Sequence, residues 1–148
     1  QDRRCHQNSF GIDNCCDNTA YLQQCSSDEQ ETVRRRDQGQ CHEVGQYCSA
    51  GSIFGCRERT KSYCCFSSML GRIVQEQGRQ QIARGWGTPE TPSCEGFTTT
   101  EIAALDWSRF DLSEFYAHIH VGNGPAQGTV TTNAQNKQQS CYYGDGRC

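Results

Sequence analysis

The sequence predicts a small disulfide-rich α+β domain, in which short helices and irregular loops are stapled around one central amphipathic helix at about residues 62–77. Three observations support this fold class. The chain has twelve cysteines in 148 residues. Leu, Ile, Val and Phe together number only 21, a share so low that apolar burial alone would not hold the chain together. The net charge is only −3, too small for the charge-driven disorder that such a composition otherwise suggests.

The central helix is predicted from apolar residues that recur at helical spacing within residues 61–81. One face of this helix would carry Phe66, Met69, Leu70, Ile73, Val74 and Gln77. The opposite face, which we expect in water, would carry Arg72, Gln75, Glu76 and Arg79. Gly78 would end the helix. Cys64 and Cys65 at its start would point about 100° apart, so we expect them to reach two different neighbours.

All the cysteines are expected to form disulfides, because their number is even and a zinc site would need paired C-x-x-C motifs that the sequence lacks. Disulfides require an oxidising compartment, so the protein is predicted to be exported. Neither a metal nor a cofactor is expected, and the pairing cannot be read from the sequence. The predicted disulfide cysteines are Cys5, Cys15, Cys16, Cys25, Cys41, Cys48, Cys56, Cys64, Cys65, Cys94, Cys141 and Cys148.

Further elements are predicted from capping signals and spacing. A surface helix is expected at residues 27–38, with Ser27 as N-cap and Gly39 after its end. Thr98 with Glu101, and Asp111 with Glu114, have the capping-box spacing that opens a helix. Residues 41–60 suit short strands or loops, because glycines separate their cysteines. Trp86 is expected to pack against the flank of the central helix.

Residues 118–121 alternate like a short strand. His118 and His120 would then share one face, where they could bind a metal. Because no third ligand is identifiable, an exposed strand face is the preferred interpretation.

The chain is divided into a cysteine-rich core at residues 1–121 and a C-terminal part of the same domain at residues 122–148. The second part is a polar loop with a tail that Cys141 and Cys148 anchor, either to each other or to the body. Tyr142 and Tyr143 are the best sequence-based candidates for a partner-binding surface. The alternative is that these tyrosines only cover a disulfide.

The sequence argues against an enzyme. A Gly-x-Ser-x-Gly motif and a glycine-rich phosphate loop are both absent. Phe66-Ser67-Ser68 stands where secreted phospholipases carry a His-Asp pair after their Cys-Cys. Glu76 and Asp106 are possible paired carboxylates, but nothing in the sequence brings them together. A transmembrane segment is not predicted, since no run of 18 apolar residues occurs, and scattered basic residues give no indication of nucleic-acid binding.

Several motifs together resemble one known family. They are CHEVGQYCS, KSYCCFSSMLGRIVQEQGRQQ, GWG with a following Pro and Cys, and LSEFY. This combination is similar to the cysteine-rich carboxyl-terminal part of TraN, the mating-pair stabilisation protein of F-type conjugation systems. The resemblance runs from FGIDNCC at residues 10–16 to about Ala117, and is only loose over residues 122–148.

The resemblance implies a non-enzymatic scaffold and binding domain that supports donor–recipient contact during DNA transfer. Its location would be the bacterial outer membrane surface, the periplasm or the extracellular space. The implied partners are a recipient outer-membrane protein or donor conjugation and secretion-channel proteins, with self-association as a further possibility. Family members are much longer, and their variable receptor-binding tip is not in this chain, so receptor specificity does not carry over.

Two alternatives remain from the residues alone. One is a structural subunit of an envelope or extracellular assembly, and the less favoured one is a small secreted hydrolase. Gln1 either follows a removed signal peptide or marks a cut from a longer protein.

Overall fold

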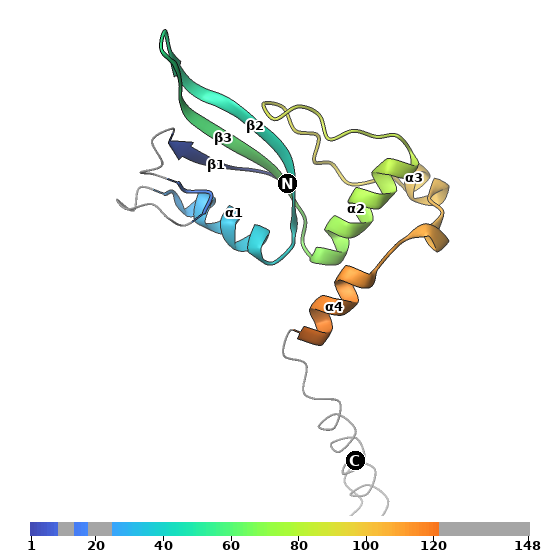
Figure 1. Ribbon diagram of the computed structural model, residues 1–148. Coiled ribbons are helices and arrows are strands. Elements are labelled where there is room, and N and C mark those ends of the chain that lie inside the picture. The colour runs from blue at the N-terminus through green and yellow to red at the C-terminus, as the bar shows by residue number, and fades with distance from the viewer. Residues whose placement is uncertain (9–13, 18–24, 122–148) are drawn as a thin grey trace, which may run out of the picture. The chain divides into compact units, whose positions relative to one another are not determined.

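The computed structural model describes residues 1–8, 14–17 and 25–121 (Figure 1). It comprises two compact units, Gln1–Phe110 and Asp111–Cys148, which are treated separately below. The disulfide-rich α+β class is confirmed, since the first unit combines a three-stranded sheet, helices and five disulfides. The predicted division at residue 121 stays a prediction.

The sheet is antiparallel, with strand order β1-β3-β2. Its strands are β1 (Asp2–Asn8), β2 (Cys41–Ser52) and β3 (Gly55–Cys65). The central element of the unit is therefore β3, which pairs with both neighbours. Residues 41–60 form strands as expected, although these are longer than the short strands predicted.

The predicted helix at residues 62–77 is wrong in its first part. Residues up to Cys65 belong to β3, and helix α2 spans Met69–Gln81 with Ser68 as its N-cap (Figure 1). Ser68 Oγ accepts a hydrogen bond from the Gly71 backbone N–H at 3.0 Å, which fixes this start. Gly78 does not end the helix either. It lies inside α2, where an added Cβ would come within 3 Å of the Phe97 ring.

The Cys-Cys pair keeps its predicted role for a different reason. Successive residues of a strand point to opposite faces of the sheet. Cys64 is bonded to Cys94 in the loop after α2, and Cys65 is bonded to Cys41 on β2. Adjacent cysteines therefore do reach two different neighbours, but from the last two positions of a strand.

The buried centre is built around β3. Tyr63 and Cys65 form a cluster with the Cys5–Cys16 disulfide, and all four residues are no more than 2% exposed. The partly buried Cys41 packs against this cluster. Helix α1 (Ser27–Asp37) lies against β1 and contributes the buried Thr32 and Val33. Disulfide sulfur atoms therefore supply much of the buried apolar contact that aliphatic side chains supply in other protein cores.

Helix α1 follows the predicted charge order, with acids in its first turn and arginines in its last. Its N-cap is Ser26 rather than Ser27, and the capping box uses Glu29. Gly39 follows its end at φ 68°, and the Gly39 and Gln40 N–H groups bond to Arg36 and Arg35 carbonyls as in a Schellman motif.

The polar face of α2 is buried, contrary to the sequence-based expectation. Arg72, Gln75 and Arg79 are no more than 8% exposed, whereas Ile73 is the one fully buried member of the predicted apolar stripe. The reason lies in the irregular chain around α2. Arg72 Nε donates to the Gly39 carbonyl at 2.7 Å, and Arg79 donates to two loop carbonyls, so buried backbone acceptors are satisfied.

Three short helices complete the described chain. Helix α3 (Thr99–Ala104) opens with the predicted capping box of Thr98 and Glu101, and a 3₁₀ turn η1 (Trp107–Arg109) follows it. In the second unit, α4 spans Ser113–Val121. The predicted strand at residues 118–121 is therefore wrong. Positions two apart on a helix lie about 200° apart around its axis, so the strand geometry behind the predicted histidine pair does not apply.

Candidate functional site

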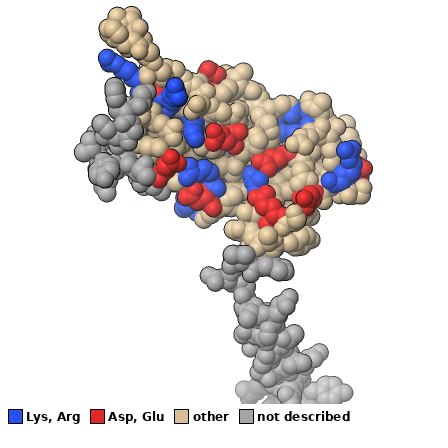
Figure 2. Space-filling model, in the orientation of Figure 1, with Lys and Arg blue, Asp and Glu red and all other residues tan. Residues whose placement is uncertain are grey.

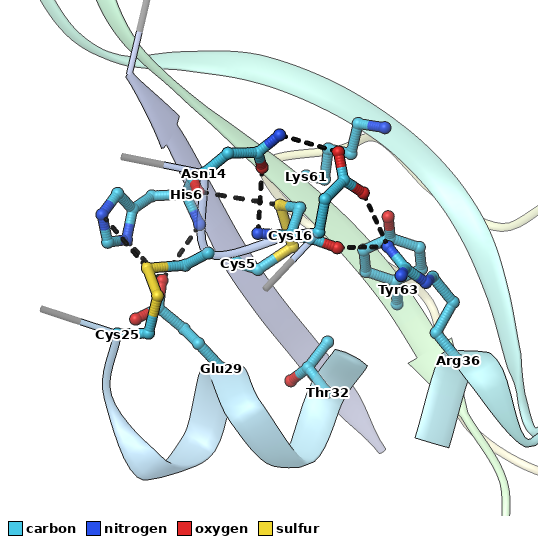
Figure 3. Close-up of a disulfide and its surroundings, with 12 residues drawn as sticks. Cys5, His6, Asn14, Cys16, Cys25, Glu29, Thr32, Arg36, Lys61 and Tyr63 are labelled. Atoms are coloured by element: carbon cyan, nitrogen blue, oxygen red, sulfur yellow. Dashed lines mark hydrogen bonds and ion pairs between the residues drawn. A yellow bond between two sulfur atoms is a disulfide. The ribbon is translucent and has the colours of Figure 1, made fainter. Parts of the chain in front are cut away.

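Figure 3 shows the disulfide region where the start of the chain is fixed to the sheet. Cys5 on β1 is bonded to Cys16, and the neighbouring Cys15 is bonded to Cys25 just before α1. A side-chain N–H of Arg36 donates to the Cys16 carbonyl. Burial and the nearby Glu43 carboxylate raise the pKa of Tyr63 to about 12, so this phenol stays neutral and donates to Glu43 Oε2 at 3.2 Å. These contacts make the region a rigid frame.

His6, Cys15 and Glu29 lie close enough together to resemble a metal site, with ligand atoms all within 4.8 Å of one another. Cys15 is consumed in a disulfide, however, and only a free thiolate is a good ligand. Glu29 also accepts hydrogen bonds from the Ser26 and His6 backbone N–H groups at 2.9 and 3.0 Å. The cluster therefore joins β1 to α1, and it offers two ligands, His6 and Glu29, rather than three.

A second cluster joins the sheet to α2. His42 Nδ1 lies 2.7 Å from Glu76 Oε1, and Arg72 Nη1 donates to Glu76 Oε2 at 2.7 Å. Burial favours the neutral acid, but the His42 hydrogen bond and the Arg72 charge outweigh it and lower the pKa of Glu76. The Trp86 ring stacks on His42 at 4.0 Å, and the Arg79 guanidinium lies 4.0 Å from the Trp86 ring centre. The prediction that Trp86 packs against the helix is confirmed.

An open groove of about 470 Å³ borders β1 and the start of α1. Opposite charges line it in pairs. Arg3 lies 3.6 Å from Asp28, and Arg4 lies 3.0 Å from Asp2. Because these charges are already paired, the groove gives no clear preference for an anionic or cationic ligand.

The most unusual surface is the end of the β2–β3 hairpin, which extends away from the body of its unit (Figure 1). Ser52 pairs with Gly55, so Ile53 and Phe54 form the loop. They are 95% and 90% exposed, more than any other large apolar residue of the described chain. Figure 2 shows uncharged atoms at this projecting end, with basic side chains close behind it. We call Ile53 and Phe54 the hairpin tip.

The candidate site residues predicted from the sequence, as far as the structure describes them, do not come together in one site. Glu76 and Asp106 have separate partners, since Asp106 Oδ1 accepts from the Ser108 N–H at 3.1 Å and caps η1, so nothing indicates a carboxylate pair. Ten of the twelve cysteines form five disulfides, the fifth of which joins Cys48 to Cys56. The remaining two, Cys141 and Cys148, together with Tyr142 and Tyr143, lie outside the described residues, so their predicted roles stay predictions.

The hairpin tip was missed in the sequence, although a signal for it exists. Cys48 and Cys56 are eight residues apart and bracket the Ser52 to Gly55 turn, which holds two large apolar residues. A disulfide that close to a turn predicts a hairpin, and an apolar pair at its loop would be exposed.

Comparison with known proteins identifies the family. Residues 1–98 match the family described as F-type Type IV secretion system, TraN. The chain belongs to the TraN family. The family model starts at residue 1 rather than near residue 10, and it covers the chain as far as residue 98.

A curated relative supports the assignment. This chain is 34% identical to "Mating pair stabilization protein TraN" of Escherichia coli (strain K12) in an alignment of 125 residues that covers 80% of this chain. The chain spans about a fifth (21%) of the length of that relative. No solved structure matches the fold significantly. Among the described residues, no helix is both long and apolar enough to cross a membrane.

Proposed function

We propose that the chain is a non-enzymatic scaffold and binding domain of a conjugative mating-pair stabilisation protein, which supports donor–recipient contact during DNA transfer. The similarity to the Escherichia coli mating pair stabilization protein supports this role. The single structural observation that carries it is the stapled frame, in which the Cys41–Cys65 and Cys64–Cys94 disulfides fix both faces of β3 at the end opposite the hairpin loop.

The proposed location is the outer membrane surface, the periplasm or the extracellular space. The five disulfides support export, because they persist in oxidising compartments. The proposed partners are a recipient outer-membrane protein or donor conjugation proteins. Buried side chains such as Arg79 are used in structural hydrogen bonds, which fits a scaffold better than a catalytic site.

A cross-linking pull-down tests this function. The oxidised chain is offered separately to donor and recipient envelopes, with a reduced and alkylated sample as control. Capture of a recipient outer-membrane protein would mean that this segment itself recognises the target cell. Capture of donor secretion-channel proteins alone would mean that it is the anchoring base. If the oxidised and reduced samples capture the same proteins, or neither captures any, the proposal is wrong.

A further inference from the structure

The end of the β2–β3 hairpin is a separate structural feature, because β1 accompanies β3 only as far as the pairing of Asn8 with Glu58. Beyond that point, among the residues that the structure describes, only β2 and β3 continue the sheet, and residues 48–55 are all exposed. An isolated two-stranded ribbon is only marginally stable in water. The Cys48–Cys56 disulfide closes this ribbon, so its tip is held in place without packing on the body.

Ile53 and Phe54 are not the residues usually found in a two-residue hairpin loop. Two-residue hairpin loops favour Asn-Gly or similar pairs that accept a positive φ. Ile53 and Phe54 have negative φ angles, since Ala83 is the only non-glycine residue of the described chain with a positive φ. They also leave nearly their whole apolar surface in water. The backbone of this turn gives no reason for two large apolar residues, so their exposure indicates a function outside the chain.

The residues behind the tip are basic or small. Arg57 and Arg59 are both exposed on β3, close behind the tip. The ladder is irregular at Arg57, which lies between the residues of β3 that pair with Ala50 and Gly51. Glu58 is the only acid within residues 48–59. Its Oε1 accepts a hydrogen bond from Ser49 Oγ at 2.8 Å, so it is held along the ribbon. The other residues before the tip are Ser49, Ala50, Gly51 and Ser52, which add little bulk.

We propose that the hairpin tip inserts into the surface of a phospholipid bilayer with anionic headgroups. Ile53 and Phe54 would enter the boundary between headgroups and acyl chains, while Arg57 and Arg59 contact lipid phosphates. A convex tip of two side chains is too small for a stable protein interface, which buries about 800 Å² on each partner. An apolar end with a basic collar instead has the charge and shape that an anionic membrane surface accepts.

This inference does not rest on the proposed function, because binding to lipid is measured with the oxidised chain alone. Flotation with phosphatidylcholine vesicles, with and without phosphatidylglycerol, gives the partition constant. We expect the chain to float with anionic vesicles, and to do so less as salt is raised, because salt screens the arginine–phosphate attraction. Failure to float with anionic vesicles at low salt would overturn the proposal.

Variants separate the contribution of the apolar hairpin tip to lipid binding from that of Arg57 and Arg59. Ile53→Ser with Phe54→Ser should reduce the partition constant at least about tenfold, because the apolar burial is lost. Arg57→Gln with Arg59→Gln should reduce it about fivefold per arginine, and only for anionic vesicles. Trp107→Ser, at a residue that is 53% exposed elsewhere in the same unit, is the matched control and should bind like the parent.

A position-specific probe guards against indirect effects. Phe54→Trp should add tryptophan emission that shifts to the blue on vesicle binding and is quenched by brominated lipid, after the parent spectrum is subtracted. Equal loss of binding in the Trp107→Ser control, or emission from the introduced tryptophan that vesicles leave unchanged, would contradict insertion. Photo-cross-linking from position 54 that yields protein adducts but no lipid adduct in envelopes would assign the tip to a protein pocket instead.

Discussion

At the scale of single residues, buried Arg79 shows how a polar side chain substitutes for an apolar core. It is 1% exposed, and its Nη1 and Nη2 donate to the Gly85 and Glu95 carbonyls at 2.7 and 2.6 Å. Its Nε donates to Gln75 Oε1 at 3.1 Å. One side chain therefore fixes both ends of the loop that carries Trp86 and Cys94.

Replacing this arginine tests its role. Arg79→Met should lower the free energy of unfolding by about 3 kcal/mol or more, because charge-assisted hydrogen bonds contribute about 1.5–3 kcal/mol each and two carbonyls lose their donor. Urea denaturation of the oxidised protein measures the change. Arg34→Met, on the exposed side of α1, is the control and should unfold at nearly the parental urea concentration. Similar losses in both variants would show that Arg79 has no special role.

The Glu76 carboxylate predicts a dependence of stability on pH. Its pKa in the folded protein lies below the ordinary value of 4.5, so the folded state binds this proton less readily than the unfolded state. The stabilisation is therefore complete above about pH 4.5 and is lost as the pH falls through the lower folded-state pKa. The pKa of Glu29 is shifted in the same direction.

Glu76→Gln should flatten this acid-side decline without abolishing it, because Glu29 and other carboxyl groups with a lowered pKa, such as Glu31, contribute the remainder. Chemical denaturation at a series of pH values between about 3 and 6 is the measurement. A variant whose stability falls as steeply as that of the parent would mean that the His42–Glu76–Arg72 cluster does not stabilise the fold.

The residue-scale errors of the sequence analysis have one physical cause. The spacing of Arg72, Gln75 and Arg79 correctly places them on one helix face, but spacing does not reveal what that face meets. Here it meets loop backbone whose carbonyl groups need hydrogen-bond donors, and an arginine supplies such donors whereas a leucine does not. Local sequence signals predict the structure better. The Thr98–Glu101 capping box opens α3 as expected, and Gly39 follows the end of α1 as expected.

At the scale of elements, the turn at residues 86–93 fixes the position of Cys94. Gly87 has φ 78°, and an added Cβ would lie 2.4 Å from the Thr91 carbonyl oxygen. Gly87→Ala should therefore lower the free energy of unfolding by at least about 2 kcal/mol, from backbone strain and the clash together. Gly96→Ala, where nothing lies within 4 Å, should be neutral or slightly stabilising. Thermal melts of the two variants compare them directly, and equal melting temperatures would contradict this account.

Two disulfides on different elements should differ in their effect on stability. Replacing Cys64 and Cys94 by Ser releases a loop from the sheet and should cost about 2–4 kcal/mol. Replacing Cys48 and Cys56 by Ser frees only the exposed ribbon, so global unfolding should change little while proteolysis near the tip increases. A larger loss of stability on removing the Cys48–Cys56 disulfide than on removing the Cys64–Cys94 disulfide would contradict this account.

The element that the sequence analysis misassigned was the end of β3. Residues 61–65 fit a helix by their position before an amphipathic stretch, and only partner strands far away in the chain make them a strand. Pairing of Tyr63 with Arg3 and with Glu43 is non-local information that periodicity does not contain. The α2 helix itself was predictable over most of its length because its own spacing and its Ser68 cap are local.

At the scale of the whole molecule, cross-links around β3 replace a large apolar core. The fold class and the family followed from cysteine number and motif order. The pairing did not, because it depends on which faces β3 presents. The same reasoning explains why the hairpin tip needed a structure, since only the pairing of Ser52 with Gly55 leaves Ile53 and Phe54 alone at the end.

The most direct test of this central claim is a disulfide map of the oxidised chain by proteolysis and mass spectrometry. The map must separate Cys64 from Cys65 by cleaving between them or by fragmenting the linked peptides. The account predicts Cys64 linked to Cys94 and Cys65 linked to Cys41, one bridge from each face of β3. Cys64 linked to Cys41, or Cys64 and Cys65 sharing one partner segment, would contradict a strand at this position and with it the stapled frame.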